Sequence, residues 1–273
     1  MPELPEVETT RKTLLGATGK NIAQVYFSKV APVETTSKAS IKRALLLANL
    51  SEISRVGKYL LFQTEAGKAL VVHLGMSGQL LFFADNPPPR AKHTHLELIF
   101  ADGALLRFID PRRFGTISLA NNDSSENPFL ARLGPDYLGK LNSQTFIDRC
   151  RRHPNIDLKT LTLNQKIATG LGNIYSCEAL YLAKLDPRRK VKNTSDAELS
   201  TLLKSAKYIL KIGIKHCGSS LKDYVDGKGA KGEMQNFLQV YGRDGSSTLN
   251  GGEKVIKVVQ QGRSTWFSPT VQK

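Results

Sequence analysis

The second residue of the chain acquires a distinctive chemistry once the initiator methionine is removed. A small residue such as Pro2 normally permits removal of Met1, and Pro2 then carries a secondary α-amine. The pKa of an α-amino group is about 7.7–8.0, against about 10.4 for lysine, so far more of it is neutral at pH 7. A neutral amine attacks a carbonyl carbon to give an iminium, which draws electrons from the neighbouring carbons. Glu3 and Glu6 lie close enough to carry protons, provided that burial raises one of their pKa values.

Two later segments combine glycine with side chains that a tight loop would present at the surface. His73-Leu74-Gly75-Met76-Ser77-Gly78 places Met76 between glycines, as in a tight loop that presents an apolar side chain. Asp110-Pro111-Arg112-Arg113-Phe114-Gly115 sets Arg112 beside Phe114 between proline and glycine. Such an apolar side chain inserts between bases, while a guanidinium occupies the hydrogen-bonding positions that a displaced base leaves. The structural alternative is a buried methionine beside a turn and a solvated arginine pair.

Further residues predict contacts with phosphate groups. The glycines of Gly170-Leu171-Gly172-Asn173-Ile174-Tyr175 precede an apolar-periodic helix, and N–H groups at a helix N-terminus bind phosphate. Asn173 adds a side-chain donor, and Lys159 upstream can reach the same phosphates. Lys58 follows Gly57 where two predicted strands meet, although a lysine in such a turn is more often simply solvated.

The balance of charge predicts a polyanionic partner. The 273 residues include 39 Lys and Arg against 24 Asp and Glu, which gives a formal net charge of +15. Because like charges repel in a compact fold, this excess of positive charge does not stabilise the fold. It predicts binding to nucleic acid or to an anionic membrane surface. The three cysteines, Cys150, Cys177 and Cys217, are too few for a disulfide scaffold or a four-cysteine zinc site.

Neither a membrane span nor a signal peptide is expected. No run approaches the roughly 18 apolar residues that a transmembrane helix needs. Residues 1–6 are acidic where a signal peptide would be basic and then apolar. Free thiols are typical of a reducing compartment, so we expect a soluble intracellular protein.

Hydrophobic periodicity predicts a β-rich first part. A helix is expected from Pro5, which suits a first helical position, to the glycines at 16 and 19. Residues 20 to 120 consist of short β-rich runs, interrupted by one helical stretch at 40–49, and predict a mostly antiparallel sandwich or barrel. Examples of the expected strands are 22–27, 59–63, 69–73, 79–83, 95–100 and 104–109.

The rest of the chain is predicted to be helical and to end in a hairpin. The segments with helix-period apolar residues are 143–152, 156–163, 174–183 and 196–216. Two short runs joined across Gln261-Gly262, at 254–260 and 264–267, predict a β-hairpin. The fold class is therefore α+β, with domains at 1–133, 134–239 and 240–273.

The motifs described above occur together with others in a single order. They are Met1-Pro2-Glu3-Leu4-Pro5-Glu6-Val7-Glu8-Thr9, Val56-Gly57-Lys58-Tyr59-Leu60, the blocks at 73–78, 110–115 and 170–175, Val240-Tyr241-Gly242-Arg243 and Gly262-Arg263-Ser264-Thr265. As a set, they resemble the formamidopyrimidine-DNA glycosylase family along essentially the whole chain. The resemblance implies an N-terminal antiparallel β-sandwich flanked by helices, a helix–two-turn–helix domain and a C-terminal β-hairpin.

The resemblance also implies an activity. It is that of a monomeric, bifunctional base-excision repair enzyme, which removes 8-oxoguanine and formamidopyrimidines from duplex DNA and nicks the abasic strand by β,δ-elimination. The implied nucleophile is Pro2, which attacks C1′ of the damaged nucleotide, and Glu3 protonates the sugar ring oxygen. Glu6 and Glu178 match further active-site carboxylates, and Lys58 matches a lysine that contacts the lesion and its phosphate. No cofactor is expected, and the implied location is the cytoplasm or another compartment that holds DNA.

The remaining implied roles concern DNA binding. A first set of three side chains fills the space left by the displaced base. A second set of four side chains contacts phosphates, and one loop closes over the flipped base. The first set is Met76, Arg112 and Phe114; the second is His73, Lys159, Asn173 and Arg263; the loop is residues 219–241.

The C-terminal segment departs from the family pattern. Members usually end in a zinc finger with two Cys-x-x-Cys pairs, and these positions fall here on Thr248, Gly251, Ser268 and Val271. None of these residues binds zinc well, so we expect a zincless finger that is held by packing, with no metal ligands. A smaller departure is Asn164, where many members carry aspartate at a helix cap.

Two other functions remain open on the sequence alone. One is a zincless relative directed at oxidised pyrimidines, although such relatives often lose part of the set formed by Met76, Arg112 and Phe114. The other is a non-catalytic binder of damaged DNA, against which the intact Pro2-Glu3 pair counts.

Overall fold

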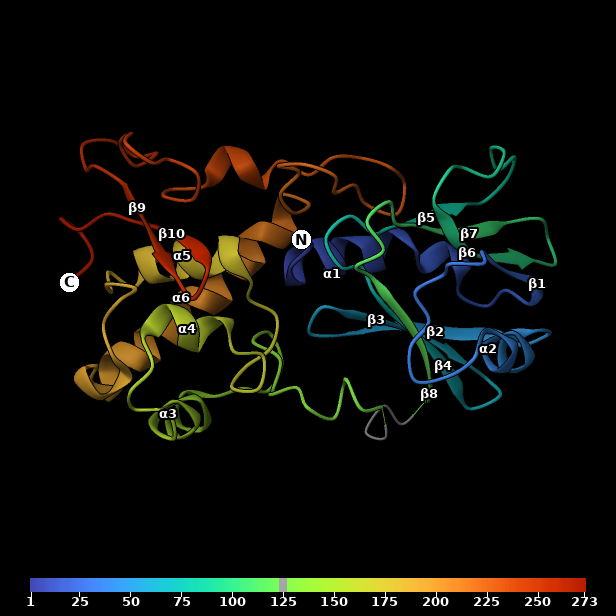
Figure 1. The fold of residues 1–273 in the computed structure, drawn as a ribbon, viewed down its shortest axis with the longest axis horizontal. Helices are drawn as coiled ribbons and strands as arrows, with labels where there is room; N and C mark the ends of the chain where they lie inside the picture. The colour runs from blue at the N-terminus through green and yellow to red at the C-terminus, as the bar shows by residue number, and fades with distance from the viewer. Residues whose placement is uncertain (123–126) are drawn as a thin grey trace. The chain divides into compact units, whose positions relative to one another are not determined.

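A computed structural model describes residues 1–122 and 127–273 of the chain, in two compact units (Figure 1). The first unit comprises residues 1–132 together with 216–233, and the second comprises 133–215 together with 234–273. The units divide the chain differently from the three predicted domains. Residues 216–233, the first part of the predicted loop, group with the N-terminal unit, and the hairpin segment groups with the helices.

The first unit is built on two antiparallel sheets of four strands each within the described residues. One sheet has the strand order β1-β6-β7-β5 and the other β2-β3-β4-β8. The strands are β1 (Ile22–Phe27), β2 (Leu50–Val56), β3 (Tyr59–Thr64), β4 (Lys68–His73), β5 (Gln79–Phe83), β6 (Thr94–Phe100), β7 (Leu105–Ile109) and β8 (Thr116–Asn121). Apolar side chains from both sheets, such as Leu70 and Val72 of β4 and Leu98 of β6, share one buried core. The predicted antiparallel sandwich is thereby confirmed.

Helix α1 (Leu4–Thr13) begins where the sequence predicts. Glu3 and Glu6 form a capping box at its start, and Pro5 lies in the first turn, where its missing N–H costs no hydrogen bond. Val7 of α1 and Leu14, which follows the helix, reach the core between the sheets. The helix therefore fixes the N-terminal residues to the sandwich.

The second helix of this unit differs from the prediction. Helix α2 spans Lys38–Leu45 rather than 40–49, because the Ser37 hydroxyl caps its start by accepting from Ser40 N at 3.0 Å. The residues after it bond to β1 instead of continuing the helix. Leu47 has a φ of 64° and donates its N–H to the Ile22 carbonyl at 2.8 Å.

The second unit consists of helices and a hairpin, as predicted. Its α-helices and strands are α3 (Ser143–Arg151), α4 (Leu158–Leu163), α5 (Asn173–Leu182), α6 (Asp196–Lys215), β9 (Ile256–Gln260) and β10 (Arg263–Phe267). α6 packs against α3 and α5, and β10 packs against α5. Ser195 and Glu198 cap α6 reciprocally, and its buried residues, Leu199 to Gly213, recur at helical spacing.

Candidate active site and nucleic-acid interface

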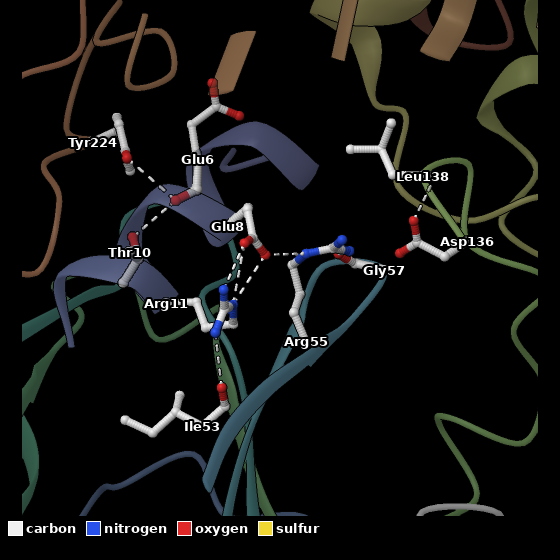
Figure 2. Close-up of polar contacts among 10 residues, drawn as sticks. All are labelled: Glu6, Glu8, Thr10, Arg11, Ile53, Arg55, Gly57, Asp136, Leu138 and Tyr224. Atoms are coloured by element: carbon white, nitrogen blue, oxygen red, sulfur yellow. Dashed lines mark hydrogen bonds and ion pairs between the residues drawn. The ribbon is translucent and has the colours of Figure 1, made fainter. Parts of the chain in front are cut away.

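The N-terminal residues are held at the start of α1. Pro2 is buried and Glu3 is 2% exposed. One carboxylate oxygen of Glu6 accepts from Glu3 N at 2.8 Å, and the other accepts from Ser219 N at 2.7 Å. The Tyr224 hydroxyl donates to the Glu6 carbonyl at 3.2 Å, as Figure 2 shows. Glu6 therefore joins the helix start to the loop that follows residue 216.

More of this loop is bonded to the same unit. Gly227 donates its N–H to the Thr13 hydroxyl at 2.8 Å, and the Gly227 carbonyl accepts from Phe82 N at 2.8 Å. Gln79 donates from Nε2 to the Asp223 carbonyl at 2.7 Å. The first part of the predicted loop is thus held at α1 and β5 by hydrogen bonds at several points along its length.

A network of charges positions the turn that contains Lys58 (Figure 2). Glu8 of α1 accepts from Arg11 in a bidentate arrangement, with Nη2 at 2.8 Å and Nε at 3.1 Å. Arg55 of β2 donates from Nε to Glu8 at 3.0 Å and from Nη1 to the Gly57 carbonyl at 2.8 Å. Gly57, with a φ of 60°, makes the tight turn before Lys58, whose side chain is only 6% exposed. The turn is therefore fixed to α1 through Arg55.

Two loops of the sandwich run side by side and carry the predicted base-stack residues. β4 pairs with β8 and β5 pairs with β7, so the β4–β5 and β7–β8 connections cross between the sheets together. Met76 is 42% exposed and Phe114 is 53% exposed, which is unusual for large apolar side chains. The guanidinium carbon of Arg112 lies 4.8 Å from the centroid of the Phe114 ring. The structure thus brings these three predicted residues onto two adjacent loops.

His73 ends β4 just before the first of these loops. Its Nδ1 accepts from Gly75 N at 3.1 Å, so the remaining proton of the neutral ring is on Nε2. Burial, reinforced by the nearby charge of Lys58, lowers the pKa of His73 from 6.5 to about 4. At neutral pH this residue offers a neutral N–H donor rather than a positive charge.

In the second unit, Asn173 connects α5 to the hairpin. It is the first residue of α5, after Gly170 with a φ of 124° and Gly172 at the N-cap. Its Nδ2 donates to the Ser264 carbonyl of β10 at 2.9 Å. Its buried Oδ1 has no hydrogen-bond partner among the described residues. The bond from Asn173 to Ser264 thereby holds the hairpin beside the N–H groups at the start of α5.

Lys159, in contrast, points into the second unit. It is 1% exposed, and its Nζ donates to the Asn173 carbonyl at 3.1 Å and to Cys177 Sγ at 2.9 Å. Burial of Cys177 raises the pKa of its thiol, although the adjacent Lys159 opposes this. In this structure Lys159 supports the start of α5 from inside, so a direct phosphate contact requires its side chain to move.

Glu178 is also fully buried in the second unit. Its carboxylate accepts three backbone N–H groups, from Gln239 at 2.8 Å, Val240 at 3.0 Å and Tyr241 at 2.9 Å. Burial raises the pKa of Glu178, and these hydrogen bonds only partly oppose that shift. The contacts make Glu178 an anchor for the chain that enters the hairpin.

The hairpin presents Arg263 at its tip. Gln261 and Gly262 have φ values of 48° and 71°, as a two-residue turn between twisted strands requires. Arg263 is exposed and pairs in register with Gln260. On the other side of the strands, Trp266 lies against Tyr241 with the ring centroids 4.4 Å apart.

The four positions where the family carries zinc ligands are linked here by hydrogen bonds within two pairs, 248 with 251 and 268 with 271. The Thr248 hydroxyl donates to the Gly251 carbonyl at 3.1 Å, and Val271 N donates to the Ser268 carbonyl at 3.2 Å. Gln272 accepts from Ser268 N at 2.9 Å and donates to the Leu185 carbonyl at 2.9 Å. Among the residues that the structure describes, no group of three or more His, Cys, Asp or Glu side chains is placed to hold a metal ion.

Comparison with known proteins identifies the family. A family model for the formamidopyrimidine-DNA glycosylase N-terminal domain matches residues 1–117, and one for the H2TH domain of the same family matches residues 133–225. The chain is 39% identical to the formamidopyrimidine-DNA glycosylase of Heliobacterium modesticaldum over 277 residues, which cover all of both proteins. It is 36% identical to that of Pelotomaculum thermopropionicum over 275 residues, covering 100% of this chain and 99% of the relative. This chain therefore belongs to the formamidopyrimidine-DNA glycosylase family.

Solved structures agree with this assignment. The Lactococcus lactis Fpg in complex with DNA that contains an abasic site superimposes with a TM-score of 0.89 at 34% identity, and each chain is covered completely. A variant of that protein, bound to DNA that contains Fapy-dG, also gives 0.89, at 35% identity and full coverage. The predicted α+β fold is confirmed. Among the described residues, no helix combines the length and the apolar character that a membrane crossing requires.

The structure also identifies residues to which the sequence assigned no role. Glu8 lies within the N-terminal motif, and Ser77 and Asp110 lie within the two loop motifs, yet only their neighbours were assigned. The available signal was only that each is a polar residue inside a motif already singled out. Arg55 and Cys177 carry no such signal, because their roles depend on partners distant in sequence.

Proposed function

We propose that this protein is a base-excision repair DNA glycosylase with AP-lyase activity, which removes oxidised purines such as 8-oxoguanine and formamidopyrimidines from duplex DNA. The observation that carries the proposal is the N-terminal arrangement. Pro2 and Glu3 are buried at the start of a helix that Glu6 caps, in a chain that belongs to this family over its whole length. With Met1 removed, the Pro2 amine becomes the end of the chain.

The reaction begins at Pro2. Its nitrogen forms a bond to C1′ of the damaged nucleotide as the bond to the base breaks, and the proton that the amine releases neutralises the departing base. Glu3 then protonates the ring oxygen of the sugar, and cleavage of the bond between C1′ and that oxygen opens the ring and leaves an iminium. The iminium so formed makes the C2′ proton acidic. Loss of that proton breaks the C3′–O bond, and a second elimination breaks the C5′–O bond, so the abasic strand is cut on both sides. Each step uses proton transfer and bond exchange alone.

The exposed loops of the first unit support recognition. Met76, Arg112 and Phe114 enter the space left by the base, with Arg112 replacing its hydrogen bonds to the opposite base. Their exposure and the proximity of Arg112 to the Phe114 ring favour this role. The presence of all three favours oxidised purines over oxidised pyrimidines as substrates.

Basic and N–H donor groups position the DNA backbone. We assign phosphate contacts to Lys58, His73, Asn173 and Arg263, and to Lys159 after a change of its side-chain conformation. The net charge of +15 supports a polyanionic partner, so binding should weaken steeply as salt is raised. We infer that a monomer acts on damaged duplex DNA in the cytoplasm or another compartment that holds DNA.

A nicking assay with matched duplexes tests the proposal. The substrates contain 8-oxoguanine, thymine glycol or no lesion at the same position. The proposal predicts rapid cleavage of the 8-oxoguanine strand, with phosphates left at both ends of the gap, and little cleavage of the other two. Preferential cleavage at thymine glycol would favour the pyrimidine-directed alternative. Tight binding of 8-oxoguanine duplex without any nick would favour the non-catalytic binder.

A further inference from the structure

A buried carboxylate lies between the two loops that carry Met76 and Phe114. Asp110 follows β7 and is 0% exposed. One of its carboxylate oxygens accepts from the Ser77 hydroxyl at 2.6 Å, and the other accepts from Gly115 N at 2.8 Å. Ser77 belongs to the first loop and Gly115 to the second. The carboxylate of Asp110 therefore binds both loops at once.

Ser77 adds a second connection between the same loops. Its side chain is buried, at 4% exposure. The hydroxyl that donates to Asp110 also accepts from Arg112 N at 3.2 Å. Ser77 directly follows Met76, so this hydroxyl ties the backbone beside Met76 to the backbone of Arg112.

The backbones of the two loops are in direct contact at this point. A Cβ on Gly75, which has a φ of +61°, would lie 2.3 Å from the carbonyl carbon of Phe114. A Cβ on Gly115 would lie 2.8 Å from the carbonyl oxygen of His73. No side chain fits between the loops, so a displacement of one requires a displacement of the other.

The second loop is also held in a conformation that its own residues do not favour. Arg113 has a φ of 54°, a left-handed backbone that a residue other than glycine rarely adopts. Its N–H donates to the Asp110 carbonyl at 3.3 Å, and His95 donates to the same carbonyl from Nε2 at 3.0 Å. The bonds to Asp110 thus maintain the turn that places Arg112 and Phe114 on the same side.

We propose that Ser77 and Asp110 are positioning residues, which lock the two loops so that Met76, Arg112 and Phe114 enter the DNA as one rigid group. The inference rests on the proposed function and identifies residues that support one of its steps. Unstacking a base step costs free energy, and the inserted side chains must supply it. If the loops were free to move, they would lose conformational entropy when their side chains enter the DNA. That loss would offset part of the free energy that the inserted side chains supply.

The proposal distinguishes two kinds of substrate. A lesion in duplex DNA must be displaced from the stack before Pro2 can reach it. A single strand with a preformed abasic site has no base to displace, and its C1′ aldehyde is a carbonyl that the Pro2 amine can attack directly. Loss of the lock should therefore impair the first reaction and spare the second, whereas general damage to the fold would impair both.

Ser77→Ala is the variant best suited to the test. It removes one hydroxyl and leaves the bond between Asp110 and Gly115 in place. Asp110→Ala would remove the acceptor of both loops and so risk unfolding. Ser118→Ala is the matched control, because Ser118 of β8 is 1% exposed and its hydroxyl accepts from Asn127 Nδ2 at 3.3 Å, a residue outside both loops.

The experiment measures kcat/KM on 8-oxoguanine duplex and strand cleavage on a single-stranded abasic oligonucleotide. Ser77→Ala should lower the first value roughly tenfold, as expected for loss of one hydrogen bond to a charged group. It should leave the second within about twofold of wild type, and Ser118→Ala should leave both unchanged. Equal losses on both substrates, or no loss on the duplex, would overturn the proposal. Wild-type protein that cleaves neither substrate would overturn the proposed function itself, before any variant is compared.

Discussion

Arg55 joins Glu8 to the turn that precedes Lys58 (Figure 2). Its Nε donates to the Glu8 carboxylate at 3.0 Å and its Nη1 donates to the Gly57 carbonyl at 2.8 Å. Glu8 lies on the helix that begins beside Glu3, and Gly57 directly precedes Lys58. One guanidinium thus sets the position of the Lys58 turn relative to the helix of the N-terminal amine.

The first prediction concerns Glu8. Burial raises its pKa, but the hydrogen bonds and charges of Arg11 and Arg55 outweigh that effect, so its pKa lies below its ordinary value of 4.5. A depressed pKa means that the stabilisation is present above pH 4.5 and is lost as pH falls through the lowered value. Glu8→Gln should lower the free energy of unfolding at pH 7 by about 2 kcal/mol. Below pH 4.5, the free energy of unfolding of this variant should fall less steeply with pH than that of the wild type.

Urea unfolding at a series of pH values checks this prediction. Glu65→Gln is the control, because Glu65 is exposed in the same unit. Equal stability of the Glu8 and Glu65 variants at pH 7 would show that the ion pairs of Glu8 contribute nothing to the fold.

The second prediction concerns His73, whose pKa is lowered to about 4 by burial and by the charge of Lys58. The unfolded chain takes up this proton near pH 6.5, whereas the folded protein does so only near pH 4. The unfolded state therefore gains relative stability as pH falls from 6.5 to 4. His73→Gln should reduce the fall in Tm between pH 7 and pH 5. Identical slopes for variant and wild type would contradict the buried, neutral histidine.

The third prediction concerns the cysteines. Burial raises the pKa of Cys150 to about 12 and also raises that of Cys177, whereas Cys217 is exposed. A thiol reacts as its thiolate, so iodoacetamide at pH 8 should label the native protein at Cys217 alone. All three cysteines should react in urea, as peptide mass spectrometry can show. Native labelling of Cys150 or Cys177 would contradict the burial of these two thiols.

The fourth prediction concerns the hairpin. The positions that carry zinc ligands in the family are joined here in two pairs by hydrogen bonds, Thr248 with Gly251 and Ser268 with Val271. Treatment with EDTA should therefore leave both Tm and the nicking rate unchanged. Thr248→Ala should lower the free energy of unfolding by about 1 kcal/mol, because the single proton of its hydroxyl is shared between the Gly251 carbonyl at 3.1 Å and the Glu253 carboxylate at 3.0 Å. A drop in activity after chelation, with recovery on adding zinc, would contradict this account of the hairpin.

Local signals were sufficient for most of the fold. The capping residues and glycines around α1 and the period of the later helices predicted those elements closely. No bounds were predicted for β2, because its polar residues give no clear alternation. None were predicted for β8 either, because its partner, β4, is distant in sequence. The end of α2 was misplaced for the same reason, since Leu47 bonds to the Ile22 carbonyl rather than within the helix.

In the site too, features set by neighbouring residues could be predicted, whereas features set by residues distant in sequence could not. Exposure of Met76 and Phe114 follows from the glycines and proline around them, so the motifs predicted it. The inward direction of Lys159 could not be predicted, because it depends on Cys177 in the next helix. The loop after residue 216 groups with the first unit because Glu6 accepts from Ser219, a contact between residues more than 200 positions apart.

The most direct test of the central claim is borohydride trapping on 8-oxoguanine duplex, with the attachment site mapped by mass spectrometry. Protein from which Met1 has been removed should give a covalent adduct on the nitrogen of Pro2. The same chain with an N-terminal extension, which leaves Pro2 without a free amine, should give none. An adduct on a lysine, or no adduct from correctly processed protein, would contradict the account.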